Sequence, residues 1–378
     1  MASTEILAHS ALFASNFLLG VGAVVSKLGL AGCNPVLFAL LREAVAAPCL
    51  FALSVATEGA QSSLACGIMS STRRGMSTDD RRQFFTAGIL LFGTNLLYII
   101  GVKFLGATAA AIWQSSLPIF TMLISVAVGY ELLTILKVIG VLVAFAGCAF
   151  VTLYEPSAAA EDSGGADLMV ALERRAVQVR GHLVFLVQVV CCAGFFVAEK
   201  PLLQRWSPLA TLAYSYAIAS SFMLCAGILI NANPEALDVV CPDCEGFGWR
   251  VPAGSLLAIG YWIIFGSVSA YYLATWGNQY VEASMVGVYF TVQPLASIVA
   301  ALAIIFATAP PHYGLTGLGV QDLGAIPIFL GVALLIHDAR LRSTKSDVES
   351  RSVGGQVGNG KPTGMDSPAA PPYERLTG

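Results

Sequence analysis

Lys27-Leu-Gly-Leu-Ala-Gly-Cys-Asn-Pro35 returns in outline later in the chain as Lys200-Pro-Leu-Leu-Gln-Arg-Trp-Ser-Pro208. In both stretches a lysine closes an apolar run, and a proline follows eight positions later (27 to 35 and 200 to 208). A second set of residues repeats with a displacement of 176 positions (118 to 294): Ala107, Thr108, Trp113, Ser115 and Pro118 recur as Ala283, Ser284, Tyr289, Thr291 and Pro294. The chain therefore contains an internal duplication.

The composition is that of a protein embedded in a lipid bilayer. Hydrophobic residues make up 56% of the sequence and charged residues 11%, against about 25% charged residues in ordinary soluble domains. The net charge of −3 and the lack of a basic stripe interleaved with aromatic residues exclude nucleic-acid binding. The first residues, Met1 to Ala8, contain Glu5 and no Lys or Arg, so we expect the first span to be an uncleaved anchor.

Apolar runs predict about ten transmembrane helices, since a helix needs about 20 apolar residues to cross the hydrocarbon core. The runs lack the alternation of a membrane β-barrel, and helices satisfy their own backbone groups in lipid. The predicted fold class is an all-α polytopic membrane protein. We expect its spans at about 8–29, 35–56, 84–104, 108–129, 133–153, 182–200, 209–230, 254–276, 281–305 and 319–337.

The ten spans form two copies of five, and an odd number of crossings turns the second copy upside down relative to the first. Inverted five-helix repeats of this kind are an architecture of secondary transporters. The expected parts of the chain are a short N-terminus (1–7), the first repeat (8–153), a polar linker (154–181), the second repeat (182–337) and a tail (338–378). Because the tail is rich in Ser, Gly, Pro and charge, we expect it to be disordered.

Lys and Arg in the connections predict the orientation, because cytoplasmic loops carry the excess of positive charge. With the N-terminus inside, the cytoplasmic connections hold the larger share of these residues, although Arg174, Arg175 and Arg180 argue against it. We therefore predict an integral, multi-pass membrane protein with both termini in the cytoplasm. The sequence leaves open whether the membrane is the plasma membrane or an internal one.

Several motifs resemble other kinds of site. The segment 355–361 begins like a phosphate-binding loop, but Pro362 stands where Ser or Thr should hold magnesium and no strand precedes it. Cys241 and Cys244 have the spacing of a zinc knuckle without a second pair of ligands, so a local disulfide and two free thiols are the alternatives. We predict no catalytic residues, no metal ion and no cofactor. The scattered histidines are expected at membrane interfaces: His9, His182, His312 and His337.

Pro118 and Pro294, at equivalent positions in the two copies, predict broken helices. Each removes an amide that would bond four residues back, so the carbonyls of Gln114 and Phe290 are expected to lose their usual partners. Matching breaks in two halves point to a substrate site near the bilayer midplane, with a simple packing seam of small residues as the alternative. The side chains predicted to bind substrate around the breaks are Trp113, Gln114, Ser115, Tyr289, Thr291 and Gln293.

Polar side chains inside other spans complete the predicted substrate site. Asn16, Asn95 and Tyr98 are added to it, although Asn within a span is as often a bridge between helices. Arg42 is a candidate for binding an anion, since charged residues inside spans are costly and tend to be functional, with a structural ion pair to another helix as the alternative. Arg42 and Glu43 point about 100° apart on a helix, so we expect them not to neutralise one another directly.

Two acidic residues are candidates for coupling transport to protons. These are Glu43, inside a span, and Glu199, at the end of a span. The alternative for Glu199 and its neighbour Lys200 is that they anchor the end of the span by reaching toward the membrane surface.

The ordered recurrence of these segments resembles the drug/metabolite transporter superfamily, with two tandem EamA-like repeats covering about residues 8–337. The resemblance looks strongest toward the plant nodulin-like branch, and it implies a ten-helix carrier with a central cavity that works by alternating access. Glu131 departs from the repeat, because the second half has no matching acid. The segments that carry the resemblance are 27–35, 200–208, the run 97–108 leading to Pro118, and Gly140 with Gly147 matched by Gly324 with Gly331.

We therefore predict a secondary transporter of a small organic metabolite, such as an amino acid, an auxin-like compound or a related solute. A cavity of aromatic and amide groups suits an amphipathic solute with a carboxylate or an amine. The predicted partners are the solute and the lipid bilayer, with protons and a second copy of the chain left open. A non-transporting membrane scaffold or receptor is the alternative from another class, while an intramembrane enzyme lacks clustered nucleophile, base or metal ligands.

Overall fold

Helices make up all of the regular structure in the described residues, and strands are absent from them. Seven of the helices are long and apolar enough to cross a membrane, judged by length and composition. The predicted all-α polytopic fold class is confirmed. The computed structural model describes residues 2–30, 32–58, 76–153, 168–241, 244, 246–307, 323, 326–327, 329–338 and 341 of the 378-residue chain.

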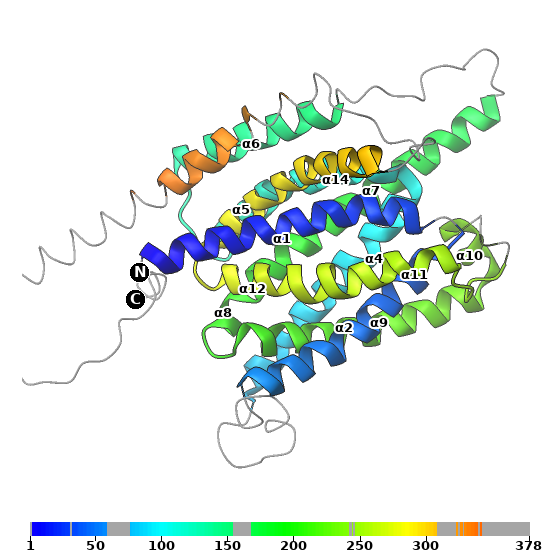
Figure 1. Ribbon diagram of the computed structural model, residues 1–378, viewed down its shortest axis with the longest axis horizontal. Coiled ribbons are helices and arrows are strands. Elements are labelled where there is room, and N and C mark those ends of the chain that lie inside the picture. The colour runs from blue at the N-terminus through cyan, green and yellow to red at the C-terminus, as the bar shows by residue number, and fades with distance from the viewer. Residues whose placement is uncertain are drawn as a thin grey trace, which may run out of the picture.

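The first half of the chain forms the helices α1 (Ala2–Gly29), α2 (Pro35–Glu58), α4 (Thr78–Ser115), α5 (Leu117–Ala127) and α6 (Ile135–Leu153), as Figure 1 shows. The turn before α2 contains Gly32 with a φ of 64°, a conformation that favours glycine. Pro35 then opens α2, because the first turn of a helix has no use for the N–H that proline lacks. A capping box at α4 has Ser77 and Asp80 satisfying each other's backbone N–H groups.

The long element α4 contains a reversal of the chain. Leu105 packs against Gly181 of α7 (Leu168–Ala198), and Trp113 donates a hydrogen bond to His182, the next residue of that helix. The two ends of the segment 105–113 therefore lie at the same level of α7. The apolar helices Thr78–Leu105 and Trp113–Ala127 on either side correspond to the third and fourth predicted spans.

The second half continues from α7 through the helices α8 (Lys200–Leu203), α9 (Pro208–Ala232) and α10 (Pro234–Val240). The eighth predicted span is one rod built from α11 (Ala253–Tyr261), the π-helix η2 (Trp262–Ala270) and α12 (Tyr271–Asn278). The ninth is built from α13 (Ala283–Tyr289), the short 3-10 turn η3 (Phe290–Val292) and α14 (Gln293–Ala307). A final apolar helix covers Phe329–Asp338.

Parts of the predicted organisation differ from the structure or lie outside the described residues. Helix α7 begins at Leu168, inside the predicted linker 154–181, because Leu, Met, Ala, Glu and Arg after that point are all good helix formers. Residues 154–167 and most of the predicted tail are outside the described residues. Within the described residues, three predicted spans are represented by shorter apolar segments: Trp113–Ala127, Ile135–Gly147 and Phe329–Asp338.

The two halves interlock by exchanging equivalent contacts. Helix α1 packs against α12 and α14 of the second half, α7 packs against α4 and α5 of the first half, and α2 packs against α9. Ser255 bonds to the carbonyl of Gly29 and Ser15 to that of Ala270, so α1 is antiparallel to the α11–α12 rod. Since Glu199 at the end of α7 meets Asn278 at the end of this rod, α7 runs with the rod and opposite to α1 (Figure 1).

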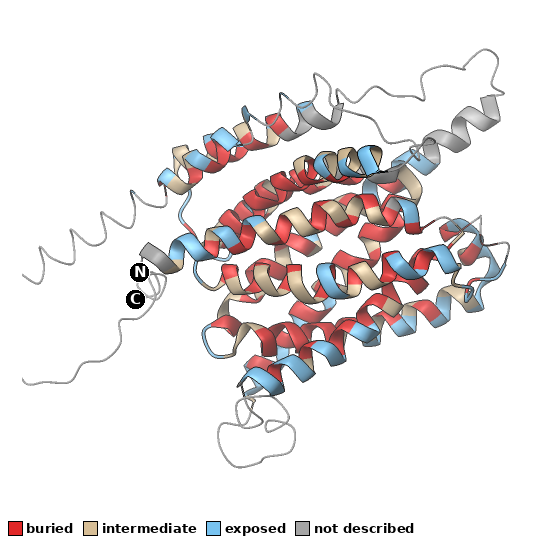
Figure 2. Cartoon of the chain, in the orientation of Figure 1, coloured by how far each residue is buried: buried red, intermediate tan, exposed pale blue. Residues whose placement is uncertain are grey.

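Buried residues lie on the inward faces of the helices, and exposed residues lie on the outer faces and the chain ends (Figure 2). Many of the outer side chains are large and apolar: Leu257 and Phe306 are each 86% exposed. Such a surface is unfavourable in water and matches a hydrocarbon solvent. Gly331 of the last apolar helix lies against the backbone of α6 at Gly140, so these two peripheral helices pack closely together.

Candidate functional site

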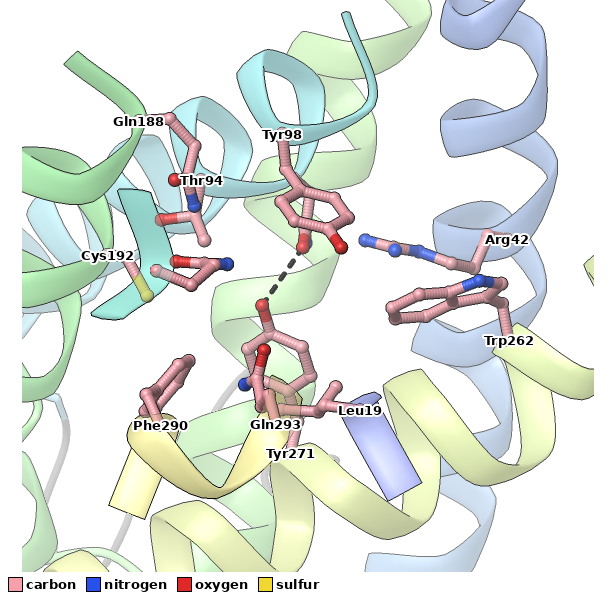
Figure 3. A pocket seen from close by; sticks show the side chains of 12 residues that line it. Leu19, Arg42, Thr94, Tyr98, Gln188, Cys192, Trp262, Tyr271, Phe290 and Gln293 are labelled. Carbon is pink, nitrogen blue, oxygen red and sulfur yellow. Dashed lines mark hydrogen bonds between the residues drawn. The ribbon is translucent and has the colours of Figure 1, made fainter. Parts of the chain in front are cut away.

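A cavity of about 20 Å³ lies between the two halves (Figure 3). This volume is enough for about one water molecule, so the cavity has no room for an organic solute in this structure. Eight elements line the cavity, three from the first half of the chain (α1, α2 and α4) and five from the second half (α7, η2, α12, η3 and α14), because the halves interlock. Its lining is polar and aromatic: Leu19, Arg42, Thr94, Asn95, Tyr98, Gln114, Gln188, Cys192, Trp262, Tyr271, Phe290 and Gln293.

Arg42 and Glu43 of α2 form a buried ion pair beside this cavity. The Nη2 atom of Arg42 lies 3.6 Å from Oε1 of Glu43, and both side chains are at most 1% exposed. Our prediction that these neighbours do not neutralise one another is wrong, because the long Arg42 side chain bends back toward the only carboxylate within reach in the described structure. The guanidinium also lies 4.9 Å from the ring centre of Trp262, a cation–π distance.

The charged groups of this pair keep unused hydrogen-bonding capacity. Among the described residues, Nε and Nη2 of Arg42 and both carboxylate oxygens of Glu43 have no hydrogen-bond partner. Buried polar atoms without partners are costly, so such atoms beside a cavity are suited to receive water or a bound molecule. Arg42 lines the cavity directly, and Glu43 lies behind it.

Amide side chains from both halves add to this capacity. Gln114 Oε1, Asn95 Nδ2 and both polar atoms of Gln188 are buried without a hydrogen-bond partner in the described part of the chain. Gln293 instead donates to Asn16 Oδ1 at 2.9 Å, and Asn16 in turn donates to the Leu12 carbonyl of its own helix. The cavity therefore offers both donors and acceptors, and Asn16 supports it from behind.

Both prolines stand where a helix is interrupted. Pro118 is the second residue of α5, just after the turn at Ser116 that ends α4, and Pro294 is the second residue of α14, just after η3. The carbonyl of Phe290 accepts from the N–H of Gln293, so the 3-10 turn supplies a partner in place of the lost one. Gly287 faces Pro118 closely, since a Cβ at Gly287 would lie 3.1 Å from the Pro118 Cα. The two broken helices therefore cross at this glycine.

The predicted substrate-binding residues separate into two groups. Those that line the cavity are Arg42, Asn95, Tyr98, Gln114 and Gln293. Those placed elsewhere are Trp113, Tyr289, Ser115, Thr291 and Asn16, because consecutive residues of a helix point in different directions. Ser115 and Thr291 are fully buried, and the Thr291 hydroxyl bonds to the Val288 carbonyl of its own helix.

Trp113 and Tyr289 hold equivalent peripheral positions. Trp113 Nε1 donates to His182 Nδ1 at 3.1 Å, and the Tyr289 hydroxyl lies 3.0 Å from His9 Nδ1. Trp113 and Tyr289 are 176 positions apart, like Pro118 and Pro294, and the two histidines are 173 apart (9 to 182), like Lys27 and Lys200. These pairs each join the first helix of one half to the broken helix of the other, so the internal duplication extends to individual side-chain contacts.

Seven lining residues were missed in the sequence: Leu19, Thr94, Gln188, Cys192, Trp262, Tyr271 and Phe290. Gln188 could have been predicted from the sequence, since its amide side chain is as unusual in an apolar span as those of Asn16 and Asn95. Trp262 is the first residue of the π-helix η2 and Tyr271 directly follows it, and no residue pattern in the sequence predicts a π-helix there. Their approach to Arg42 and Asn95 depends on packing between spans that are far apart in sequence.

A cluster of charged residues joins the halves at one end of the molecule. Lys137 of α6 forms ion pairs with Glu131 and with Glu282, which lies in the turn between α12 and α13. The backbone N–H of Ser284 donates to Glu131 at 3.0 Å. These charged residues have no charged counterparts: the second half has no acid matching Glu131, Lys137 corresponds to Gln321 at the displacement of 184 that relates Gly140 to Gly324, and Glu282 corresponds to Gly106 at a displacement of 176. The duplication therefore does not repeat this ion-pair cluster at the opposite end of the molecule.

Polar contacts of another kind close the opposite end. Asn34, in the turn between α1 and α2, donates to the Gly248 carbonyl at 3.1 Å. Cys241 and Cys244 form a disulfide in the connection after α10, and the Cys241 sulfur packs against the carbonyl of Cys33. Of the two alternatives for this cysteine pair, the structure has the disulfide.

A closed polar cavity between two interlocked helical halves, surrounded by membrane-spanning helices, defines a multi-pass membrane transporter. The EamA-like transporter family matches residues 6–153 and 179–337, one match for each half. The chain belongs to this family, in the drug/metabolite transporter superfamily, as its repeats predicted. Members of the family are transporters rather than enzymes. Similarity to the plant nodulin-like branch stays a prediction.

Two known proteins resemble the chain over most of its length. An uncharacterized transporter, YyaM of Bacillus subtilis (strain 168), is 22% identical over 271 residues, which is 71% of this chain and 77% of the relative. A crystal structure of a protein aligns with 89% of this chain and 99% of its own, at 17% identity and a TM-score of 0.60. At that identity the second likeness concerns the fold alone.

Proposed function

We propose that the protein is a secondary transporter that moves a small organic solute with a carboxylate group through the central cavity by alternating access. The observation that carries this proposal is the set of buried, unpartnered polar atoms on Arg42, Gln114 and Gln188 around a closed space between the halves. Such atoms favour a polar ligand, and a scaffold protein has no need of them.

The chemistry of the lining supports a carboxylate rather than an amine. Arg42 offers nitrogen atoms that only donate, and it is the charged residue that lines the cavity itself. Charge-assisted bonds between a guanidinium and a carboxylate are the strong ones. Trp262, Tyr98 and Tyr271 supply flat apolar surface beside it, which suits an aromatic or otherwise amphipathic solute such as an aromatic amino acid or an auxin-like acid.

Polar contacts between the halves at both ends of the molecule support alternating access. One end is held by the ion pairs of Lys137 and the other by the Asn34–Gly248 bond. A solute enters when one closure opens and leaves when the other does. With both termini in the cytoplasm, as the distribution of Lys and Arg favours, the ion-pair closure faces the cytoplasm.

Counterflow in proteoliposomes tests this function. We expect labelled phenylalanine or indole-3-acetic acid to exchange across the membrane, and phenethylamine, which lacks the carboxylate, to exchange more slowly. Arg42→Gln should reduce exchange of the carboxylates at least tenfold, while Arg250→Gln, at an exposed arginine, should not. Binding of these solutes without any exchange would favour the scaffold or receptor alternative.

A further inference from the structure

Glu199 is a buried acid whose nearest partners are neutral. Its side chain is fully buried at the end of α7. Asn278 Nδ2 donates to Oε1 at 2.6 Å, and the Thr275 hydroxyl bonds to Oε2 at 3.2 Å. No Lys or Arg of the described chain forms an ion pair with it. An ionised carboxylate in such a place pays a large desolvation cost that no counter-charge offsets.

The residue that could neutralise Glu199 is engaged elsewhere. Lys200 follows it in the chain, but the Lys200 ammonium donates to the backbone carbonyls of Asn278 and Val281. These carbonyls belong to the end of α12 and the turn that follows it. Lys200 therefore fastens α8 to that turn, and Glu199 is left to its amide and hydroxyl neighbours.

Both protonation states of Glu199 can be satisfied by the same neighbours. Asn278 donates to Oε1 in either state. The Thr275 hydroxyl can turn, so it donates to Oε2 when the acid is ionised and accepts from the Oε2–H group when the acid is protonated. Glu199 can therefore release and rebind a proton while each of its carboxyl oxygens keeps a hydrogen-bond partner.

Charge balance in the surrounding cluster favours a proton at this position. The charged groups around Glu199 are Lys200, and beyond it Glu131, Glu282 and Lys137, with the thiol of Cys192 on its own helix. Three carboxylates stand against two ammonium groups in this set. Glu131 and Glu282 share Lys137, so Glu199 is the acid whose protonation makes the cluster neutral.

We propose that Glu199 is a proton-binding site of this protein, and that release of its proton draws Lys200 away from the α12–α13 turn. That movement would free the turn carrying Glu282, which is one side of the ion-pair closure between the halves. The acid occurs in one half only, since its counterpart one residue before Lys27 is Ser26. The movement rests on the proposed transport function, whereas the proton site does not.

Infrared spectroscopy of the purified full-length protein tests the proton site without any solute. We expect a carbonyl band of a protonated, buried carboxyl group that fades as the pH is raised. The band should be lost in Glu199→Gln, and it should persist in Glu43→Gln, which changes the other fully buried acid, and in Glu235→Gln at the protein surface. A wild-type protein without such a band, or a Glu199→Gln variant that keeps it, would overturn the proposal.

A distance measurement tests the link to the closure. Spin labels at Leu132, after α5, and at Gln204, after α8, are on exposed residues of the two halves. The distance between them should lengthen as the pH is raised in the wild type and stay short in Glu199→Gln. In Glu199→Asp, which keeps a titratable group, the distance should lengthen at a shifted pH. This variant therefore distinguishes loss of the proton site from loss of folding. A distance that responds to Na⁺ at constant pH instead would assign the site to a metal cation and refute the proton.

Discussion

Tyr271 donates a hydrogen bond to Asn95 Oδ1 at 3.1 Å, and the two residues are 176 positions apart. This is the displacement that relates Pro118 to Pro294. A residue that touches its own counterpart must lie close to the axis that relates the two copies. Since both residues line the cavity, the cavity lies next to the approximate two-fold axis, and Figure 3 shows this hydrogen bond among the lining side chains.

Tyr271→Phe should destabilise the protein by about 1–3 kcal/mol, because it leaves a buried Asn95 oxygen without its donor. Thermal unfolding in detergent measures the change. Tyr280→Phe is the matched control, since Tyr280 is 45% exposed. Equal unfolding temperatures for the two variants would mean that the axial bond contributes nothing to stability.

Gln114→Ala and Gln293→Ala should both impair transport of a carboxylate solute, but they should differ in stability. Gln114 Oε1 has no partner to lose, so its variant should unfold like the wild type. Gln293→Ala removes the donor to the buried Asn16, which should cost about 1–3 kcal/mol. Counterflow and thermal unfolding are measured side by side, with Gln204→Ala at an exposed glutamine as the control. Full transport by both cavity variants would exclude these amides from the substrate site.

Arg42→Met should destabilise the protein by about 3–5 kcal/mol, because it removes one partner of a buried ion pair and leaves the buried Glu43 carboxyl group without a counter-charge. The double variant Arg42→Met, Glu43→Met removes both charges and should recover most of that stability. Neither variant should exchange carboxylate solutes. A double variant that is less stable than the single one would show that the pair stabilises the fold beyond mutual neutralisation.

Gly287→Ala should destabilise the crossing of the two broken helices. The new Cβ would lie 3.1 Å from the Pro118 Cα, and a backbone atom cannot rotate away. We expect a loss of about 1–3 kcal/mol in thermal unfolding. Gly254→Ala is the control, since a Cβ there meets nothing within 4 Å. If both variants behave alike, the crossing has more room than the backbone positions indicate.

Cysteines at Arg81 and Phe247 should react from opposite sides of the membrane. Both residues are exposed; Arg81 lies in the first turn of α4, where the third span of the first half begins, and Phe247 lies in the connection before the third span of the second half. Impermeant maleimide applied to sealed cells, after exchange of the exposed Cys49 and Cys225 for serine, reads the side directly. Labelling of both positions from one side would contradict the inverted arrangement of the repeats.

The sequence predicted the helical fold class and the duplication well, because both depend on features local to each span. Apolar length marks a membrane helix wherever it occurs, and a proline interrupts a helix through its own missing amide. Arg42 and Asn95 were found for a similar reason, as polar groups in apolar runs, and Gln114 was found because it stands beside the break at Pro118. Properties of one segment could therefore be inferred without knowing its neighbours.

Contacts between distant spans could not be predicted in this way. Trp113 and Tyr289 lie beside the helix breaks, yet their rings contact histidines away from the cavity. Gln188 and Trp262 instead reach the cavity from other helices. The direct pairing of Arg42 with Glu43 depends on which other charges lie within reach, and helix geometry alone does not reveal it. These outcomes are set by packing between the halves.

The trio Glu131, Lys137 and Glu282 has consequences for direction. A carrier made of two identical repeats would face each compartment equally often, because its two conformations would be related by the two-fold axis and would have the same free energy. Ion pairs at one end only make the two conformations unequal, because they lower the free energy of the conformation in which this end is closed. The protein without solute would then favour the conformation that is open at the opposite end, and solute would bind first from that side.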